Sequence, residues 1–325
     1  MNDKDLKILI IRFSSIGDIV LTSPVIRCLK EQLEGLELHY LTKRSYETVL
    51  AGNPHIDKIH YLEHSLPECI TELRNENFDF VIDLHHNLRT FWIKTKLGVR
   101  SSSFDKLNRQ KWLLVNFKLN ILPPVHIVDR YLQTVKFLGV KNDDKGLDYF
   151  LLKPYDLNEL LPGSHQGFIA VVIGAQHATK RLPVHKLIEL CSKIQGSVVL
   201  LGGPEDKERA EEIAYAAGAH IFNGCGRFKL DESAFLISKA QKVVTHDTGL
   251  MHIAAAFNKP IISVWGNTVP EFGMYPYKTK YSQIIQVKDL SCRPCSKIGY
   301  NKCPKGHFKC MNLINLDQII KESNA

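Results

Sequence analysis

Short, continuously apolar segments alternate with amphipathic segments of helical spacing along almost the whole chain. Continuous runs of Ile, Val and Leu are typical of strands that are buried on both faces of a parallel sheet, and amphipathic helices between them cover those faces. We therefore predict an α/β fold of two Rossmann-like, doubly wound parallel sheets. Predicted strands lie at 7–12, 37–41, 80–84, 168–173, 197–201, 242–245 and 260–264, and predicted helices at 24–33, 184–194, 206–217 and 231–238.

The domain boundary is predicted from a cluster of turn residues. Proline, glycine, serine and aspartate gather between Lys153 and Gly167, just before a new apolar strand begins. This boundary divides the 325 residues into two halves, and each half has the length of a typical domain. We predict an N-terminal domain at 1–160 and a C-terminal domain at 161–325.

The composition is that of an ordinary globular chain, with 44% apolar and 23% charged residues. No apolar run approaches the roughly 20 residues that a membrane-spanning helix needs, and the first residues lack the basic-then-apolar order of a secretion signal. We therefore expect a cytoplasmic protein. Its eight cysteines are then expected to stay reduced or to bind metal.

A basic stretch runs from Arg89 to Lys118, with eight cations, five aromatic residues and a single acid, Asp105. Such a stretch is typical of surfaces that bind nucleic acid, acidic lipid headgroups or a phosphorylated glycan. It also occurs as a solvated surface without any ligand. The residues alone leave these alternatives open.

Two turns, Ser14–Asp18 and Asp247–His252, follow predicted buried strands and lead into predicted helices. The first N–H groups of a helix have no partner within the helix and carry the positive end of its dipole. Both turns therefore favour an anion, such as a phosphate, at the mouth of a sheet. Ordinary turn chemistry, a helix cap or an acid in the first helical turn explains the same residues without a ligand.

Taken together, these motifs resemble glycosyltransferase family 9. The resemblance rests on the segments 12–24, 179–183 and 247–252 in that order, and it extends over nearly the whole chain. It implies the GT-B arrangement, in which two Rossmann-like domains face a central cleft that holds the active site. The best-known members are the ADP-heptose:lipopolysaccharide heptosyltransferases. Leu182 stands where the family usually has tryptophan.

The resemblance implies two catalytic residues. Asp18 occupies the family's position for a catalytic aspartate, the general base that removes the proton of the acceptor hydroxyl. Lys180 follows the Gly174-Ala175 turn, where the family has a lysine that stabilises negative charge on the leaving nucleoside diphosphate. Without the resemblance, Asp18 is equally well explained as a helix acid, and Lys180 as an ordinary surface cation.

The resemblance also implies substrate contacts. Glu205 follows the strand at 197–201, where a carboxylate accepts hydrogen bonds from ribose hydroxyls, although a helix start explains it equally well. Backbone N–H groups after Asp247 are expected to hold the diphosphate. The expected donor-binding residues are Thr179, Glu205, Asp247, Thr248, Gly249, Leu250 and His252, and the expected acceptor-binding residues are Ser14, Ser15, Gly17 and Arg89.

A cysteine-rich segment near the C-terminus gives a second signal. Cys292, Cys295, Cys303 and Cys310, with His307 between the last two, match the spacing of structural zinc sites. A similar tail occurs in the second-heptosyltransferase branch of the family, so we interpret the segment as a structural feature of the C-terminal domain. The alternatives to zinc are reduced thiols or an adventitious disulfide. No Asp-x-Asp motif follows a strand, and we expect no obligatory metal or cofactor in the reaction.

The sequence thus predicts an inverting glycosyltransferase that moves a heptose from ADP-heptose to an inner-core lipopolysaccharide acceptor. The basic stretch suits an acidic, lipid-linked acceptor and peripheral contact with the cytoplasmic face of the inner membrane. One alternative is a family member that uses another nucleotide sugar and glycan. The other is a nucleotide- or nucleic-acid-binding protein without transferase activity, although nucleic acid is the less favoured partner. The oligomeric state does not follow from the sequence.

Overall fold

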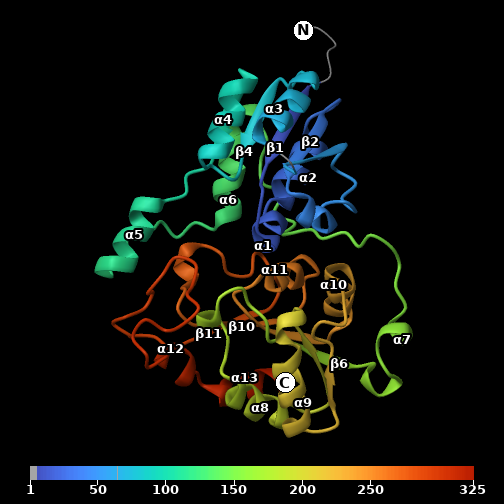
Figure 1. Ribbon diagram of the computed structural model, residues 1–325, viewed down its shortest axis with the longest axis vertical. Coiled ribbons are helices and arrows are strands. Elements are labelled where there is room, and N and C mark those ends of the chain that lie inside the picture. Colours follow the sequence, from blue (N-terminus) through green and yellow to red (C-terminus); the bar gives the residue numbers. More distant parts are fainter. Residues whose placement is uncertain (1–5, 64) are drawn as a thin grey trace. The chain divides into compact units, whose positions relative to one another are not determined.

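The computed structural model describes residues 6–63 and 65–325 and divides into two compact units (Figure 1). Unit 1 comprises Met1–Lys106 and Val125–Leu152, and unit 2 comprises Leu107–Pro124 and Lys153–Ala325. Each unit is an α/β domain built on its own parallel sheet. Two α/β domains built on parallel sheets, as the alternating pattern predicts, are thus confirmed.

The sheet of unit 1 has the order β3-β2-β1-β4-β5, and all of its strands are parallel. The strands are β1 (Lys7–Ile11), β2 (Glu37–Thr42), β3 (Lys58–Tyr61), β4 (Phe80–Asp83) and β5 (Arg100–Ser103). The helices are α1 (Ile16–Val20), α2 (Ser23–Gln32), α3 (Leu66–Asn75), α4 (Leu88–Leu97) and α6 (Ile127–Leu132), with 3-10 turns at Arg44–Val49 and Gln133–Leu138.

The sheet of unit 2 has the order β11-β10-β9-β6-β7-β8 and is also parallel. The strands are β6 (Phe168–Val172), β7 (Ser197–Leu201), β8 (Ile221–Asn223), β9 (Lys242–His246), β10 (Ile261–Trp265) and β11 (Ser282–Gln286). The helices are α5 (Asn108–Phe117), α7 (Leu157–Leu160), α8 (Val184–Lys193), α9 (Lys207–Ala217), α10 (Leu230–Lys239), α11 (Gly249–Ala256), α12 (Lys309–Asn312) and α13 (Leu316–Asn324), with 3-10 turns at Gly163–His165, Ala178–Lys180, Pro204–Asp206 and Pro270–Phe272.

The central strands are buried on both faces, as their continuous apolar runs predict. Ile8 to Ile11 of β1 are fully buried, and every residue of β6 is buried. In unit 2, side chains from α8, α9 and the segment from α12 to α13 form one core with the inward side chains of the sheet. Helices α10 and α11 pack against each other, and Figure 1 draws them opposite α8 and α9. The seven predicted strands and four predicted helices are confirmed, with ends within one or two residues.

The order of the strands fixes where ligands can bind. In unit 1 the strand order changes direction between β1 and β4, and in unit 2 between β6 and β9. Connections from neighbouring strands leave in opposite directions at such a switch point, so a crevice opens outside the carboxyl ends of the two strands. Arg12 follows β1, and Asp247 follows β9. Both motifs therefore lie at a switch point.

The units differ in composition from the predicted domains. The segment Leu107–Pro124 belongs to unit 2, where Leu114 of α5 packs against Val269 and Phe272. The later change of unit occurs between Leu152 and Lys153, ahead of the predicted boundary at 160/161. The basic stretch from Arg89 to Lys118 is therefore divided, with α4 in unit 1 and α5 in unit 2.

None of the helices in the described part of the chain is long and apolar enough to cross a membrane.

Arg27 of α2 holds the last segment of unit 1 in place. Its guanidinium donates to both carboxylate oxygens of Asp143, at 2.7 and 2.9 Å, to the carbonyl of Gly146 at 2.9 Å, and to Asp148. The side chain is 5% exposed. Although burial opposes ionisation, the two carboxylates raise the pKa of Arg27, and hydrogen bonding to Arg27 lowers the pKa of Asp143 to about 2.

We predict that Arg27→Ala lowers the free energy of unfolding of unit 1 by about 3–5 kcal/mol, because it leaves two partly buried carboxylates unpaired. Lys145→Ala removes exposed ion pairs to Glu31 and, at 3.9 Å, to Asp143, and it should destabilise the unit much less, because solvent screens exposed pairs. Urea denaturation of both variants measures the difference. Similar losses in the two variants would contradict the role given to Arg27.

Candidate active site

Asp18 lies in the first turn of α1, directly beyond the carboxyl end of β1. Its Oδ2 accepts hydrogen bonds from the backbone N–H of Ser15 at 3.1 Å and from the Ser15 hydroxyl at 2.9 Å. Its Oδ1 pairs with the guanidinium of Arg12 at 2.6 Å, and 19% of the side chain is exposed. The carboxylate is thus held in one orientation while part of its surface stays open to solvent.

Arg12 joins the ends of two strands beneath Asp18. Its other guanidinium nitrogens donate to the carbonyls of Ser14 at 2.7 Å and Leu84 at 2.6 Å, and to the Tyr131 hydroxyl at 3.1 Å. Burial opposes the charge, but Asp18 compensates and raises the pKa of Arg12. A buried guanidinium whose three nitrogens each contact an acceptor fixes the loop that carries Asp18.

His85 lies close enough to Arg12 and Asp18 for their charges to affect its pKa. Its ring lies 4.9 Å from that of Phe13, and burial together with the charges of Arg12 and Lys106 lowers its pKa to about 4. The imidazole is therefore neutral at pH 7. Local sequence indicates no role for Arg12 or His85, because their partners lie far apart in the chain.

The predicted acceptor-binding residues gather around the same loop. The carbonyl of Ser14 accepts from Arg12, Ser15 is the N-cap of α1, and Gly17 is buried in its first turn. Arg89 is exposed near the start of α4, and its guanidinium carbon lies 5.5 Å from the centre of the Phe13 ring. The local fold therefore brings these four residues to one edge of the sheet in unit 1.

Lys180 and Asp247 form an ion pair at the switch point of unit 2. The ammonium lies 2.6 Å from Oδ2 of Asp247 and 3.3 Å from its carbonyl oxygen. The same carboxylate oxygen accepts from the hydroxyl of Thr268 at 2.9 Å. Both charged side chains are mostly buried, with 17% and 11% exposed. Lys180 is thus a positioned cation and not an ordinary surface lysine.

Helix α11 begins beside this pair. Thr248 is its N-cap, with extended backbone angles, and Gly249 is its first residue. Thr248, Gly249 and Leu250 are half-buried, so the first N–H groups of the helix lie near the surface, whereas His252 is 2% exposed. A helix N-terminus next to a fixed ammonium attracts an anion.

Thr179 was predicted to bind the donor, but its hydrogen bonds are made to Tyr300 of the same unit. Its side chain is buried, and its hydroxyl donates to the carbonyl of Tyr300 at 3.0 Å and accepts from the Tyr300 N–H at 2.8 Å. Its own N–H donates to the same carbonyl at 3.1 Å. These contacts fasten the turn that carries Lys180 to the cysteine-rich segment.

Glu205 is exposed in the turn after β7, whereas its neighbour Asp206 is completely buried. Asp206 accepts from the Gly203 N–H at 3.2 Å and from Arg209 at 3.1 Å, and it lies 3.4 Å from Arg181. A Cβ on Gly174 would come within 2.4 Å of its carboxylate. Asp206 therefore ties the loops after β6 and β7 together, a role that no local sequence pattern indicates.

His246, at the end of β9, supports the turn that carries Lys180. Its Nε2 accepts the N–H of Leu182 at 2.9 Å, so the neutral ring carries its proton on Nδ1. Burial, with smaller effects from Arg209 and Arg181, lowers the pKa of His246 to about 3. The histidine is thus uncharged over the physiological range.

Comparison with known proteins identifies the family. The model of glycosyltransferase family 9 (heptosyltransferase) matches residues 68–304. The chain belongs to glycosyltransferase family 9. It is 27% identical to lipopolysaccharide heptosyltransferase 1 of Campylobacter coli, over 97% of each chain.

Two solved structures support the same fold. A family 9 glycosyltransferase from Veillonella parvula superposes with a TM-score of 0.79 at 21% identity, over 99% of this chain and 97% of that one. The ADP-heptose lipopolysaccharide heptosyltransferase II of Escherichia coli superposes with a TM-score of 0.74 at 21% identity, over 98% of each chain. Relatives of both the first and the second type thus match this family 9 glycosyltransferase.

The cysteine-rich segment of this glycosyltransferase draws its four thiols into one region. Burial raises the pKa of Cys310 to about 12, and Cys295 and Cys303 contribute to the rise. Cys292 lies 3.8 Å from Nε2 of His307. All four cysteines are free thiols. The donor set suits zinc, but no three of these ligand atoms lie within 4.8 Å of one another in the described residues.

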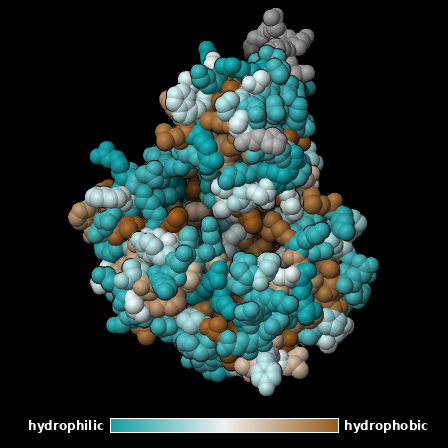
Figure 2. Space-filling view, viewed as in Figure 1, coloured by the Kyte–Doolittle hydropathy of each residue, from teal (hydrophilic) through white to brown (hydrophobic). Residues whose placement is uncertain are grey.

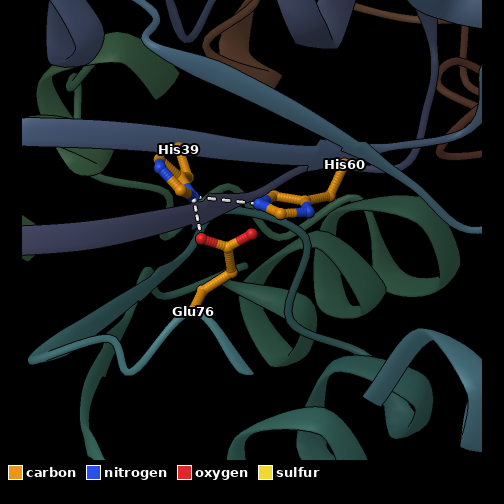
Figure 3. Close-up of side chains that lie close together, drawn as sticks. All are labelled: His39, His60 and Glu76. Atoms are coloured by element: carbon orange, nitrogen blue, oxygen red, sulfur yellow. Dashed lines mark hydrogen bonds and ion pairs between the residues drawn. The ribbon is translucent and has the colours of Figure 1, made fainter. Parts of the chain in front are cut away.

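A different group meets that distance: His39, His60 and Glu76 (Figure 3). His39 and His60 lie on β2 and β3, with their ring nitrogens 2.9 Å apart, and Glu76 ends α3. His39 also contacts Glu37 at 2.7 Å, and Glu76 pairs with Lys58 and, at 3.7 Å, with Lys7. Two ammonium groups beside the carboxylate oppose a divalent cation, so we assign this group a structural role in the sheet.

We predict that His246→Gln makes stability less sensitive to acid. In the unfolded wild-type chain, His246 binds a proton below about pH 6.5, whereas in the native protein it stays neutral down to about pH 3. The unfolded state therefore binds more protons between these values, and the free energy of unfolding falls as the pH drops through this range. The amide oxygen of glutamine can still accept from Leu182 without titrating. Denaturant unfolding at several pH values gives the free energy of unfolding as a function of pH. Between about pH 3 and 6.5, this free energy should fall more steeply in wild-type protein than in His246→Gln, by about 1.4 kcal/mol per pH unit. Equal slopes would contradict the assignment.

Proposed function

We propose that this family 9 glycosyltransferase transfers a heptose, with inversion, from ADP-heptose to an inner-core lipopolysaccharide acceptor. The observation that carries the proposal is the pair of charged groups at the two switch points, Asp18 fixed by Arg12 in unit 1 and Lys180 fixed by Asp247 in unit 2. Similarity to proteins named lipopolysaccharide heptosyltransferase and ADP-heptose heptosyltransferase supports the choice of sugar and acceptor.

Asp18 is proposed as the general base. The acceptor hydroxyl is a weak nucleophile, and a carboxylate within hydrogen-bond reach must take its proton as the new bond to the anomeric carbon forms. One oxygen of Asp18 is held by Arg12 and the other by Ser15. The orientation of the carboxylate is therefore set before the acceptor binds, which reduces the entropy lost on reaching the transition state.

Lys180 and the N-terminus of α11 are proposed to stabilise the leaving ADP. As the sugar-phosphate bond breaks, negative charge grows on the diphosphate, and a fixed ammonium beside free helix N–H groups favours that state over the ground state. Asp247 orients the ammonium through the 2.6 Å ion pair. This set of groups stabilises the diphosphate without requiring a divalent cation.

The remaining donor contacts divide into direct and supporting ones. We assign Thr248, Gly249 and Leu250 to the diphosphate and the exposed Glu205 to the ribose hydroxyls. Buried His252 supports α11, and Thr179, whose hydroxyl is used by Tyr300, supports the turn that carries Lys180. The supporting residues act on the donor through the backbone that they hold.

The acceptor is proposed to be acidic and lipid-linked, and to be met at the cytoplasmic face of the inner membrane. Ser14, Ser15 and Gly17 shape the loop next to Asp18, and the exposed guanidinium of Arg89 supplies a cation beside it. A guanidinium pairs well with the phosphate and carboxylate groups of an acidic glycan.

The cysteine-rich segment is proposed to bind a structural zinc ion through Cys292, Cys295, Cys303 and Cys310. The spacing of the cysteines is that of zinc sites. The thiols also lie close enough together for the charge of one to raise the pKa of another, as at Cys295 and Cys310. Zinc would bring the thiolates closer together and fix the segment that Thr179 contacts through Tyr300.

We predict that Asp18→Asn lowers kcat about 10²- to 10⁴-fold and leaves ADP affinity unchanged, because the amide keeps the shape of the side chain but cannot accept the proton. Release of ADP from ADP-heptose with a deacylated inner-core acceptor gives kcat, and calorimetry gives the affinity for ADP. Glu34→Gln, an exposed carboxylate of the same unit, is the matched control and should keep full activity.

Two outcomes would contradict this proposal. Full activity of Asp18→Asn would exclude the general base. Absence of ADP release by wild-type protein, with turnover of another nucleotide sugar, would overturn the donor assignment while leaving the reaction class intact.

Metal removal separates the two proposals on metals. We predict that ADP release continues in EDTA without added magnesium, because Lys180 and α11 stabilise the diphosphate. A mercurial reagent that blocks thiols should release about one zinc ion per chain, detected by a metallochromic dye, and should lower the melting temperature. Activity that depends on added magnesium would contradict the first proposal, and absence of zinc from freshly purified protein would contradict the second.

A further inference from the structure

Helix α5 is apolar on two sides, and unit 2 covers only one of them. Leu107 and Leu114 are buried, Leu114 packs against Val269 and Phe272, and the ammonium of Lys111 lies 5.9 Å from the Phe272 ring. These positions recur every three or four residues and form the inner side of the helix. These contacts hold α5 against unit 2 through its inner side, and the residues on the outer side take no part in them.

The outer side carries large apolar side chains in solvent. Trp112 is 51% exposed and Phe117 65%, with their ring centres 5.3 Å apart, and Leu119 and Ile121 beyond the helix are each 52% exposed. Figure 2 shows hydrophobic surface at the left margin, where Figure 1 labels α5. Single exposed apolar residues are common, but four within ten positions mark an interaction surface.

The charge around this surface has one sign. No acid occurs from Lys106 to Val128, and Arg109, Lys111 and Lys118 lie within that range. The ammonium of Lys118 donates to the carbonyl of Pro294 at 2.7 Å, which joins α5 to a second acid-free segment, residues 290–316. That segment adds four exposed lysines, which are Lys297, Lys302, Lys305 and Lys309.

We propose that the α5 surface, defined as Arg109, Trp112, Phe117, Leu119 and Ile121, docks on an anionic phospholipid bilayer. Aromatic rings enter the headgroup region, aliphatic side chains reach the acyl boundary, and the surrounding cations attract anionic lipid. Nucleic acid fits less well, because its bases stack on aromatic rings but leave Leu119 and Ile121 without a partner. The inference deepens the proposed function, since a lipid-linked acceptor resides in such a bilayer.

Co-sedimentation with lipid vesicles tests the surface without any sugar substrate. Wild-type protein should bind vesicles of phosphatidylcholine mixed with phosphatidylglycerol, and bind pure phosphatidylcholine far more weakly. Trp112→Ser combined with Phe117→Ser should weaken binding on the order of tenfold or more, because it removes the apolar anchor. Arg109→Gln should weaken it by about fivefold and reduce its salt dependence.

Tyr215→Ser is the matched control. Tyr215 is 94% exposed on α9 of the same unit, among the acids Glu208, Glu211 and Glu212, so its loss should leave vesicle binding unchanged. All variants replace exposed side chains, and unchanged melting temperatures would verify their fold. ADP release with the deacylated acceptor should be unaffected in the double variant, because no membrane takes part in that assay.

The outcomes separate the two proposals. Wild-type protein that releases ADP but does not bind anionic vesicles overturns the docking surface and leaves the proposed function standing. Vesicle binding without ADP release does the reverse. Equal vesicle binding by the double variant and wild type also overturns the bilayer as the partner. So does binding of poly(U) RNA in place of vesicles, if the double variant loses that binding.

Discussion

The arrangement of unit 1 around Asp18 depends on a single buried guanidinium. Arg12 reaches the end of β1 through Ser14, the end of β4 through Leu84, α6 through Tyr131 and α1 through Asp18. A charge in this position is tolerated only when each of its donors has an acceptor, so the four elements must meet in one geometry. The loop that carries the proposed base is therefore shaped by the requirements of folding before any substrate is present.

Unit 2 meets the same requirement with the charges reversed. There the fully buried group is a carboxylate, Asp206, and the guanidiniums of Arg181 and Arg209 converge on it. Gly174 leaves the space that this carboxylate occupies. Arg181 directly follows Lys180, so the contact that satisfies the buried acid also sets the backbone from which the proposed diphosphate-binding lysine extends.

The sequence predicts the interior of the fold better than its edges. All seven predicted strands exist, and the four that were not predicted, β3, β5, β8 and β11, are the outermost strands of their sheets. An edge strand has a partner on one side only and carries polar residues, as in the Arg-Ser-Ser-Ser sequence of β5, so it lacks the apolar run that identifies a buried strand. Local sequence pattern does not predict that α5 belongs to unit 2, because this depends on packing against Val269 and Phe272, which lie far along the chain.

The candidate site divides in a similar way. Asp18, Lys180 and the turn after β9 follow from motif and family resemblance, because they lie within a few residues of a strand end. Arg12, His85, Asp206 and His246 act across loops that are distant in sequence, and only the tertiary structure brings their partners together. Thr179 belongs to the motif, but its contacts with Tyr300 point to a supporting role that spacing does not reveal.

The excursion of Leu107–Pro124 into unit 2 gives the two units three covalent connections, at 106/107, 124/125 and 152/153. A single cut between Leu152 and Lys153 would separate most of unit 2 from the rest of the chain and would leave α5 covalently attached to unit 1 alone. Neither unit corresponds to one continuous stretch of the gene: a fragment that ends at residue 152 would carry α5 without Val269 and Phe272, and would expose Leu114. Subcloning the units of this glycosyltransferase therefore requires α5 to be excised from the first and supplied to the second.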